Sequence, residues 1–292
     1  MLAWIDKHLK YIFTVPTIIF VLLMIIYPIG YTLQLSFFEW SMSNTVPKTW
    51  VGLSNYIFFF KDERFAAAFR FTVWYTAVAV FIETVLGVAI ALLISKINRG
   101  ATLIKTAFIF PMVATPVAVG MVWKLIYEPT IGVANYLLEK LRIPESLWLS
   151  STGSVFGSLI MIDIWMWTPL IILIVLAGIT SLPSEPHESA LVDGAGWFRT
   201  LTKVTLPLLS SSILVAVLLR LIDCLKTFDI VYATTMGGPG YASENLNILA
   251  YRYAFEYFYF GKSSALLILF ILLVLILSIL FIFVKKRVEV EY

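Results

Sequence analysis

Four ionisable residues recur at every third position of an otherwise apolar stretch: Arg220, Asp223, Lys226 and Asp229. In a helix, a step of three residues returns side chains to neighbouring positions on one face, so oppositely charged members of this series can pair. Charges inside a membrane helix are costly unless paired, and they commonly line the path of a polar solute. Two interpretations follow. The residues form a self-neutralising ladder that fixes helix packing, or, as we favour for Arg220 and Asp223, they face a water-filled cavity.

A second apolar stretch places an aromatic residue beside polar groups, at Trp167-Thr168-Pro169. A sugar stacks its C–H face on an aromatic ring while its hydroxyl groups bind charged or amide side chains. We therefore predict a substrate pathway between the two stretches, in which Lys226 and Asp229 have only a structural role. The residues predicted to line the pathway are Met166, Trp167, Leu170, Arg220, Asp223, Cys224 and Thr227.

The segment between these two stretches predicts a short exposed helix. Pro183 and Pro186 end the preceding helix, and Ser184 belongs to the residue types that cap the start of a new one. Gly194 then supplies a C-terminal stop, so the new helix has about two turns. Such a helix, bearing small side chains, can enter a groove on another protein. From these residues alone, the simpler explanation is an interfacial helix that only closes the loop.

The elements that must position these residues are membrane helices. Of 292 residues, 60% are hydrophobic and 13% are charged, with a mean hydropathy of +0.92. This excludes a soluble globular domain, because such domains are about a quarter charged. Six stretches are long enough to cross about 30 Å of hydrocarbon. We predict an all-α membrane protein with one domain, residues 1–292, whose spans cover approximately 12–37, 71–94, 105–127, 154–179, 208–232 and 263–284.

The distribution of lysine and arginine predicts that both termini are cytoplasmic. The short segment 95–104 carries Lys96 and Arg99 and no acidic residue, whereas 128–153 carries three glutamates and two basic residues. The first span follows two lysines, as a secretory signal does. Its apolar run is too long and no small-residue cleavage pattern follows, so we interpret it as an uncleaved anchor. In this orientation, segment 180–207 with its predicted helix is cytoplasmic.

Segment 180–207 resembles the EAA motif of binding-protein-dependent ABC transporter permeases. Glu188-Ser189-Ala190 is followed after three residues by Gly194, and after nine more by Val204-Thr205-Leu206-Pro207, close to the pattern E-A-A-x3-G-x9-I-x-L-P. Two departures, Ser189 and the preceding Pro186-His187, leave the acid and the glycine in place. In that family the loop is the coupling helix that docks into the ATPase subunit. The resemblance implies this role for Glu188, Ser189, Ala190, Asp193, Gly194 and Ala195.

Other motifs are similar to the maltose-permease-like branch of sugar ABC permeases. Phe228-Asp229, Tyr232 and the run 235–239 match F-D-x-x-Y…T-x-G-G-P, and the run 51–56 agrees nearer the N-terminus. This resemblance covers almost the whole chain and implies the type I ABC importer permease fold. It also implies three kinds of partner: a second permease subunit in a heterodimer, two ATPase subunits, and an extracytoplasmic solute-binding protein. The residues implied to contact the binding protein are Gly237, Gly238 and Pro239.

The function implied by the resemblance is import of a carbohydrate, a di- or oligosaccharide, by ATP-driven alternating access. The location implied is the cytoplasmic membrane of a bacterium or archaeon, with membrane lipid around the spans. The chain has no G-x4-G-K-[ST] phosphate loop, so it is expected not to be an enzyme, and ATP and magnesium are expected on the partner ATPase. We expect no cofactor or metal on this chain.

Two alternatives stay open at this stage. The first is an importer of glycerol-3-phosphate or a related polyol phosphate in the same family, because Arg220 can bind an anion. The second belongs to a different class, a proton-coupled carrier with Glu83 as a relay. Nucleic acid is not an expected partner, because the net charge is only +3 and the basic residues are scattered.

Overall fold

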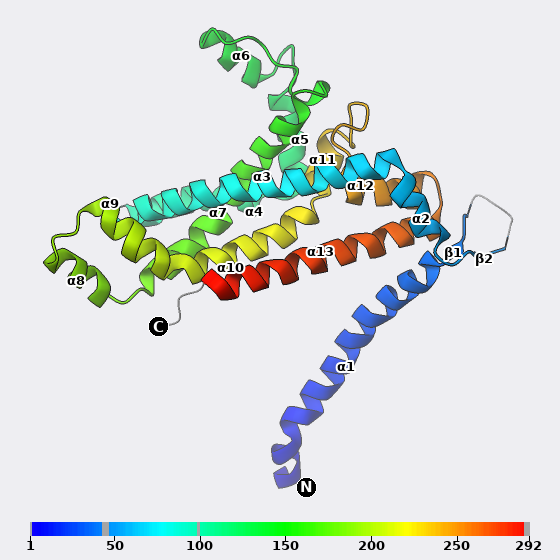
Figure 1. Ribbon diagram of the computed structural model, residues 1–292, viewed down its shortest axis with the longest axis horizontal. Coiled ribbons are helices and arrows are strands. Elements are labelled where there is room, and N and C mark those ends of the chain that lie inside the picture. The colour runs from blue at the N-terminus through cyan, green and yellow to red at the C-terminus, as the bar shows by residue number, and fades with distance from the viewer. Residues whose placement is uncertain (1, 43–46, 98–99, 289–292) are drawn as a thin grey trace. The chain divides into compact units, whose positions relative to one another are not determined.

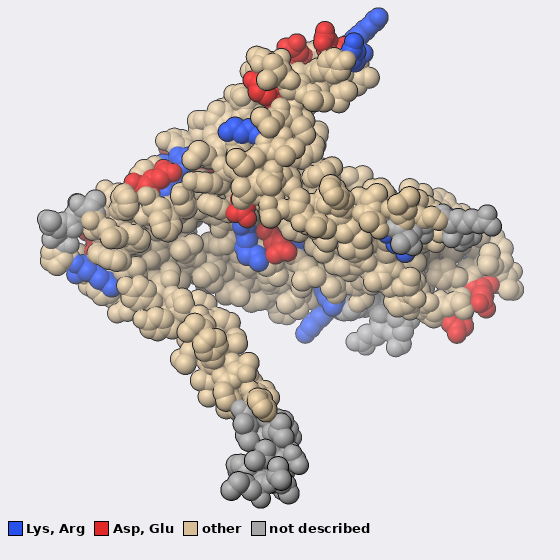
Figure 2. All heavy atoms as spheres, turned by 180° about the vertical axis from the view of Figure 1, so that it is seen from behind, with Lys and Arg blue, Asp and Glu red and all other residues tan. Residues whose placement is uncertain are grey.

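The computed structural model describes residues 2–42, 47–97 and 100–288, and their regular structure is almost entirely helical (Figure 1). Two compact units can be distinguished. One unit comprises residues 1–62 with 250–272, and the other comprises 63–249 with 273–292. On the face seen in Figure 2, charged side chains are few, as expected for a protein whose solvent is lipid.

The first unit contains α1 (Leu2–Ser36), a two-residue antiparallel strand pair, β1 (Phe38–Glu39) with β2 (Thr49–Trp50), and α2 (Ser54–Lys61). It also contains a π-helical turn, Arg252–Glu256, and the first part of α13 (Phe260–Val288). The Asn55 amide donates to the carbonyls of Ser36 (2.9 Å) and Phe38 (3.0 Å), so one side chain fixes the end of α1. The most apolar part of α1 has no buried residue.

The second unit is built around α3 (Glu63–Ile94), α7 (Val155–Thr180) and α10 (Leu206–Leu225). α7 is apolar on nearly all sides and is therefore surrounded by other helices. Small residues let these helices approach closely. A Cβ at Gly87 of α3 would clash with Ile171 of α7, and one at Gly178 of α7 would clash with Ser212 of α10.

Shorter elements connect the long helices of this unit. They are α4 (Ala101–Val113), α5 (Pro116–Ile126), α6 (Val133–Lys140), a 3-10 turn (Trp148–Ser150), α8 (Glu185–Val192), α9 (Trp197–Thr200), a π-helical turn (Leu201–Thr205), α11 (Asp229–Thr234) and α12 (Leu246–Tyr251). The last of these, α12, runs into the first unit.

The prediction of an all-helical membrane protein is confirmed. Five helices in the described residues are long and apolar enough to span a membrane, and a bent pair of helices makes a sixth candidate. The five are Phe13–Leu35, Glu63–Ile94, Val155–Thr180, Trp197–Leu225 and Phe260–Lys286. The cytoplasmic placement of both termini and the single domain over 1–292 stay predictions.

The third predicted span, 105–127, is not one straight helix. It divides into Leu103–Val113 and Pro116–Ile126, which meet at 94°. Ala114 and Thr115 are extended, with ψ of 148° and 138°. The reason is Pro116, which cannot donate a helical hydrogen bond and disfavours a helical conformation in the residue before it.

The fifth predicted span, 208–232, is displaced toward the N-terminus. Its helical path runs from Trp197 through the π-helical turn to Leu225, where α10 ends. The wider π turn lies just before Pro207, whose ring would clash with a carbonyl in a regular α-helical turn. After Leu225 the helix is interrupted, and α11 begins only at Asp229.

Candidate functional site

A polar cleft of about 260 Å³ opens at the interruption between α10 and α11. It combines one tryptophan ring with charges of both signs, a lining suited to a polar ligand that also has an apolar face. The residues that line it are Pro116, Trp167, Arg220, Asp223, Lys226, Thr227, Phe228, Asp229 and Ile230.

Four of the seven residues predicted for the substrate pathway line this cleft: Trp167, Arg220, Asp223 and Thr227. The other three lie elsewhere. Met166 and Cys224 are buried in the hydrophobic core, and Leu170 is partly buried outside the cleft. Lys226 and Asp229, which we expected to have only a structural role, do line the cleft. They reach it at the interruption that follows Leu225, where α10 has ended and α11 begins.

Arg220 pairs with residues of two other helices. Its Nε lies 2.7 Å from Oε2 of Glu83 on α3, and its Nη2 contacts Oδ2 of Asp163 on α7. All three side chains are at most 1% exposed. The expected pairing of Arg220 with Asp223 is therefore wrong. A buried guanidinium needs partners where it lies, and the two carboxylates on the neighbouring helices supply them without solvent.

The Trp167 ring connects this charge cluster with the cleft. The guanidinium carbon of Arg220 lies 5.2 Å from the centre of that ring, within the range of a cation–π interaction. Trp167 itself is partly exposed and lines the cleft. Arg220 is thus held by two carboxylates and one aromatic ring, and its charge is already compensated before any ligand binds.

The predicted pairing of Asp223 with Lys226 is present. Oδ1 of Asp223 lies 3.1 Å from Nζ of Lys226, and the two side chains are 47% and 54% exposed. This pair lies one helical turn beyond Arg220, at the end of α10. The same helix therefore carries one buried and one solvated charge group.

Two asparagine side chains form hydrogen bonds with backbone carbonyls at the interruption between α10 and α11. Nδ2 of Asn245 donates to the carbonyl of Thr227 (2.6 Å), and Nδ2 of Asn247 donates to that of Leu225 (3.0 Å). Carbonyls at the end of a helix have no partner within it, so these side chains satisfy groups that the interruption exposes. Neither asparagine is among the residues predicted from the sequence, because the only signal is two amides five and seven residues after Gly240, the last glycine of the run 237–240.

The loop that carries these asparagines is itself fixed by an ion pair and a cation–π contact. Arg64, at the start of α3, donates to both carboxylate oxygens of Glu244, from Nε to Oε2 (2.6 Å) and from Nη2 to Oε1 (2.8 Å). Glu244 is only 1% exposed, and the Arg64 guanidinium carbon lies 3.9 Å from the centre of the Tyr241 ring. This two-pronged pair fastens the loop to the bundle.

The glycine-rich run within this loop, residues 237–240, forms a tight turn. Gly237 is buried with φ of +87°, and an added Cβ would lie 3.3 Å from Glu244 and Ile248. Gly238 and Pro239 are partly exposed. The carbonyl of Gly238 accepts a hydrogen bond from the Ser243 hydroxyl (2.5 Å). Of the three residues predicted to contact a binding protein, Gly238 and Pro239 are therefore on the surface, and Gly237 shapes the turn beneath them.

The short helix predicted in segment 180–207 is present as α8, Glu185–Val192. The Ser184 side chain does not cap it, but the Ser184 carbonyl accepts from the amides of His187 (2.9 Å) and Glu188 (3.0 Å). Gly194 has φ of +70°, and the amide of Ala195 closes the turn on the carbonyl of Ala190 (2.9 Å). Among the residues implied to dock, four are exposed, Ala195 is partly buried and Ala190 is buried; the exposed four are Glu188, Ser189, Asp193 and Gly194.

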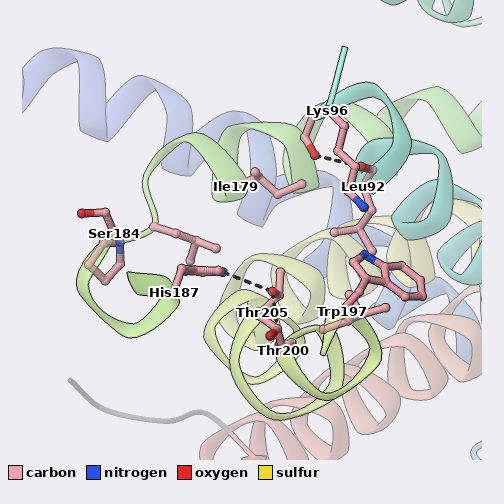
Figure 3. A pocket seen from close by; sticks show the side chains of 12 residues that line it. Leu92, Lys96, Ile179, Ser184, His187, Trp197, Thr200 and Thr205 are labelled. Atoms are coloured by element: carbon pink, nitrogen blue, oxygen red, sulfur yellow. Dashed lines mark hydrogen bonds between the residues drawn. The ribbon is translucent and has the colours of Figure 1, made fainter. Parts of the chain in front are cut away.

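A second cavity, of about 440 Å³, lies beside α8 (Figure 3). On one side of it, Nε2 of His187 of α8 lies 3.2 Å from Oγ1 of Thr205. On the other side, Nζ of Lys96 lies 4.9 Å from the centre of the Trp197 ring. The start of α8 thus contacts the segment that leads into α10.

The chain is similar in sequence to membrane components of importers. The family described as binding-protein-dependent transport system inner membrane component matches residues 65–290. The chain is 32% identical to the trehalose/maltose transport system permease protein MalF of Thermococcus litoralis, over 86% of this chain and 84% of that protein. It is 37% identical to the probable ABC transporter permease protein y4oQ of Sinorhizobium fredii, over 82% and 77% of the two chains.

A further relative and a solved structure agree with these matches. The trehalose transport system permease protein SugA of Mycobacterium tuberculosis is 32% identical, over 84% of this chain and 78% of that protein. A chain in the crystal structure of a bacterial ABC transporter involved in the import of the acidic polysaccharide alginate superposes with a TM-score of 0.84. The two chains are 22% identical, and the match covers 98% of this chain and 99% of the other. This last likeness concerns the fold.

Proposed function

The chain belongs to the family of binding-protein-dependent transport system inner membrane components, as a sugar ABC importer permease subunit and not an enzyme, and from that premise we propose that it imports a neutral di- or oligosaccharide by ATP-driven alternating access. The solute passes the cleft at the end of α10. A fixed site near the middle of the spans, reached from either side in turn, is the arrangement that this mechanism requires.

The observation that carries the choice of a neutral substrate is the charge balance of the cleft. Arg220 is compensated by Glu83 and Asp163, and Lys226 is paired with Asp223. The remaining charged residue of the lining, Asp229, is acidic. A phosphate dianion would have to displace a carboxylate to obtain a cation here, whereas sugar hydroxyls can bind these groups as they stand. This argues against a polyol phosphate as the substrate.

The same contacts argue against a proton-coupled carrier. Glu83, the expected relay residue, is buried and bound to Arg220, with Oε1 also 3.1 Å from Nη2. In this position it serves helix packing between α3 and α10. Solute transport by this chain alone, without an ATPase, would favour the carrier instead.

A transport assay with purified components tests the substrate assignment. We expect Trp167→Leu to raise the maltose or trehalose concentration needed for half-maximal uptake about tenfold, because a stacking ring is worth roughly 1 kcal/mol or more. Met166→Leu, one residue away but buried in the core, is the matched control and leaves uptake nearly unchanged. Preferential uptake of glycerol-3-phosphate, or an unchanged half-saturation in Trp167→Leu, contradicts the proposal.

In this proposal the chain works with three kinds of partner: a second permease, two ATPase subunits that bind at α8, and a solute-binding protein that binds at the loop around Gly238 and Pro239. The exposed acid and small side chains of α8 support its docking role. Gly194→Asp adds a charge and a side chain beside α8, where nothing lies within 4 Å of an added Cβ. We expect solute-stimulated ATP hydrolysis to fall at least tenfold while the complex still assembles.

Gly100→Asp is the control for that substitution. Gly100 also has a left-handed backbone, with φ of +78°, and open space around it, but it precedes α4. The two variants share the charge change and the backbone strain and differ only in location. Equal ATPase stimulation in both variants would contradict the docking assignment of α8.

A further inference from the structure

The cavity beside α8 lies at the level where two spans end. Its lining includes Leu92 near the end of α3 and Ile179 near the end of α7. α3 ends at Ile94 and α7 at Thr180, and both helices are long enough to cross the hydrocarbon. Residues directly beyond such ends lie among the lipid headgroups. The cavity therefore has an apolar wall from the spans and a rim at headgroup depth.

The rim of the cavity carries polar side chains and one cation. Lys96, His187 and Thr205 line it, and no acidic residue is among the residues that do so. Within the described part of the chain Lys96 makes no ion pair; its ammonium group lies over the Trp197 ring, a contact that leaves its charge intact. Figure 3 shows Lys96 and Trp197 together on one side of the cavity and the His187–Thr205 contact on the other. The cavity thus offers a compensating charge to an anion.

The surface beside the cavity has the composition of a membrane interface. Trp197 and Phe198 are 64% and 70% exposed. Arg199 of α9 and Lys203 of the following π-helical turn are exposed as well. Aromatic rings with basic residues mark helices that lie at the headgroups, and basic pockets between spans on the cytoplasmic side bind anionic lipids.

We propose that this cavity binds an anionic phospholipid. The phosphate pairs with the Lys96 ammonium group, and an acyl chain lies along Leu92 and Ile179. The site needs both an apolar tail and a negative headgroup, which a lipid has and an inorganic anion lacks. Because His187 of α8 lines the cavity, a bound lipid also contacts the start of that helix and stabilises its position. The proposal rests on the contacts of the cavity and does not require the substrate assignment.

Native mass spectrometry of the assembled transporter tests this proposal. The complex is delipidated in detergent and offered phosphatidylglycerol or phosphatidylcholine. We expect the wild-type complex to retain about fivefold more phosphatidylglycerol, the preference that one basic residue near the surface provides. Lys96→Ala abolishes the preference, and Lys96→Arg keeps it. Lys286→Ala, an exposed basic residue near the end of α13, is the matched control and retains the lipid.

Three results would overturn the proposal. One is equal phosphatidylglycerol retention in wild type and Lys96→Ala. Another is displacement of the lipid by millimolar inorganic phosphate, which indicates a site for a free anion. The third is efficient cross-linking of Lys96→Cys to an ATPase subunit in the resting complex, which shows that a protein covers the cavity. None of these readouts depends on transport, so a negative result leaves the proposed function untouched.

Discussion

α10 carries two charge groups one turn apart, and they lie in opposite environments. Arg220 is enclosed by α3 and α7 and bound to Glu83 and Asp163, whereas Asp223 and Lys226 are about half exposed at the cleft. Both groups lie in one apolar stretch with regular spacing. Their depth along the helix does not distinguish them, but their neighbours do. Charges with partners on adjacent helices hold the bundle together, and charges without such partners stay exposed at the cleft.

The largest expected effect on stability comes from removing the cation of the buried charge group. Arg220→Met leaves Glu83 and Asp163 facing each other without a cation, and we expect a loss of about 3–5 kcal/mol in the free energy of unfolding. Thermal unfolding of the detergent-purified chain measures it. The triple variant Arg220→Met, Glu83→Gln, Asp163→Asn removes all three charges and regains part of the loss. Wild-type stability in the single variant would show that the cluster is not a packing element.

The asparagines at the end of α10 provide an intermediate case, since they are polar but uncharged. Asn245→Ala removes the 2.6 Å donor of the Thr227 carbonyl and leaves only the 3.4 Å contact from Nδ2 of Asn247, and we expect a cost of about 1–3 kcal/mol. Asn247→Ala costs less, because Asn247 is partly exposed whereas Asn245 is buried. Amide hydrogen exchange over 226–230 should rise in both variants. Unchanged exchange would mean that the interruption is stable without these side chains.

Breaking the solvated group should scarcely affect stability. For Lys226→Met we expect a change of less than about 1 kcal/mol, the usual limit for an exposed pair. Its consequence should instead be an altered half-saturating sugar concentration in the uptake assay. A stability loss as large as that of Arg220→Met would remove the distinction between the two groups.

The smallest effect concerns a solvated carboxylate outside the spans. Glu128 accepts from the amide of Ile131 (2.7 Å) and the hydroxyl of Thr130 (2.7 Å), and these bonds lower the pKa of Glu128 below its ordinary value. A carboxylate whose pKa is lowered by folding adds stability above its unfolded pKa and loses it as the pH falls. The Tm difference between wild type and Glu128→Gln should therefore shrink on acidification from about pH 6 to pH 3. A pH-independent difference contradicts this assignment.

Local signals predicted α8 well, because its determinants lie within a few residues. Pro183, Pro186 and Gly194 mark the ends of a helix by their own backbone restrictions, and the helix forms between them. Pro116 carries a similar signal, but the predicted span 105–127 continues through it, whereas the chain turns by 94° there. How far a proline deflects a helix depends on the elements that pack on either side, which the sequence does not display.

The partners of the charged residues were the least predictable feature. The spacing of Arg220, Asp223 and Lys226 favours pairing within one helix, and only the last two residues pair in that way. Arg220 instead meets residues 57 and 137 positions away along the chain. Glu244, the ion-pair partner of Arg64, is separated from it by 180 positions.

By itself, the sequence determined the membrane class, the number of candidate spans, the short helix α8 and the family, since these follow from local composition, backbone restrictions and motif spacing. The tertiary structure alone decided which charges are buried, where α10 ends and which residues line the cleft. The physical reason is that a charge inside a membrane bundle takes the nearest partner in space, and that partner is set by how distant helices pack.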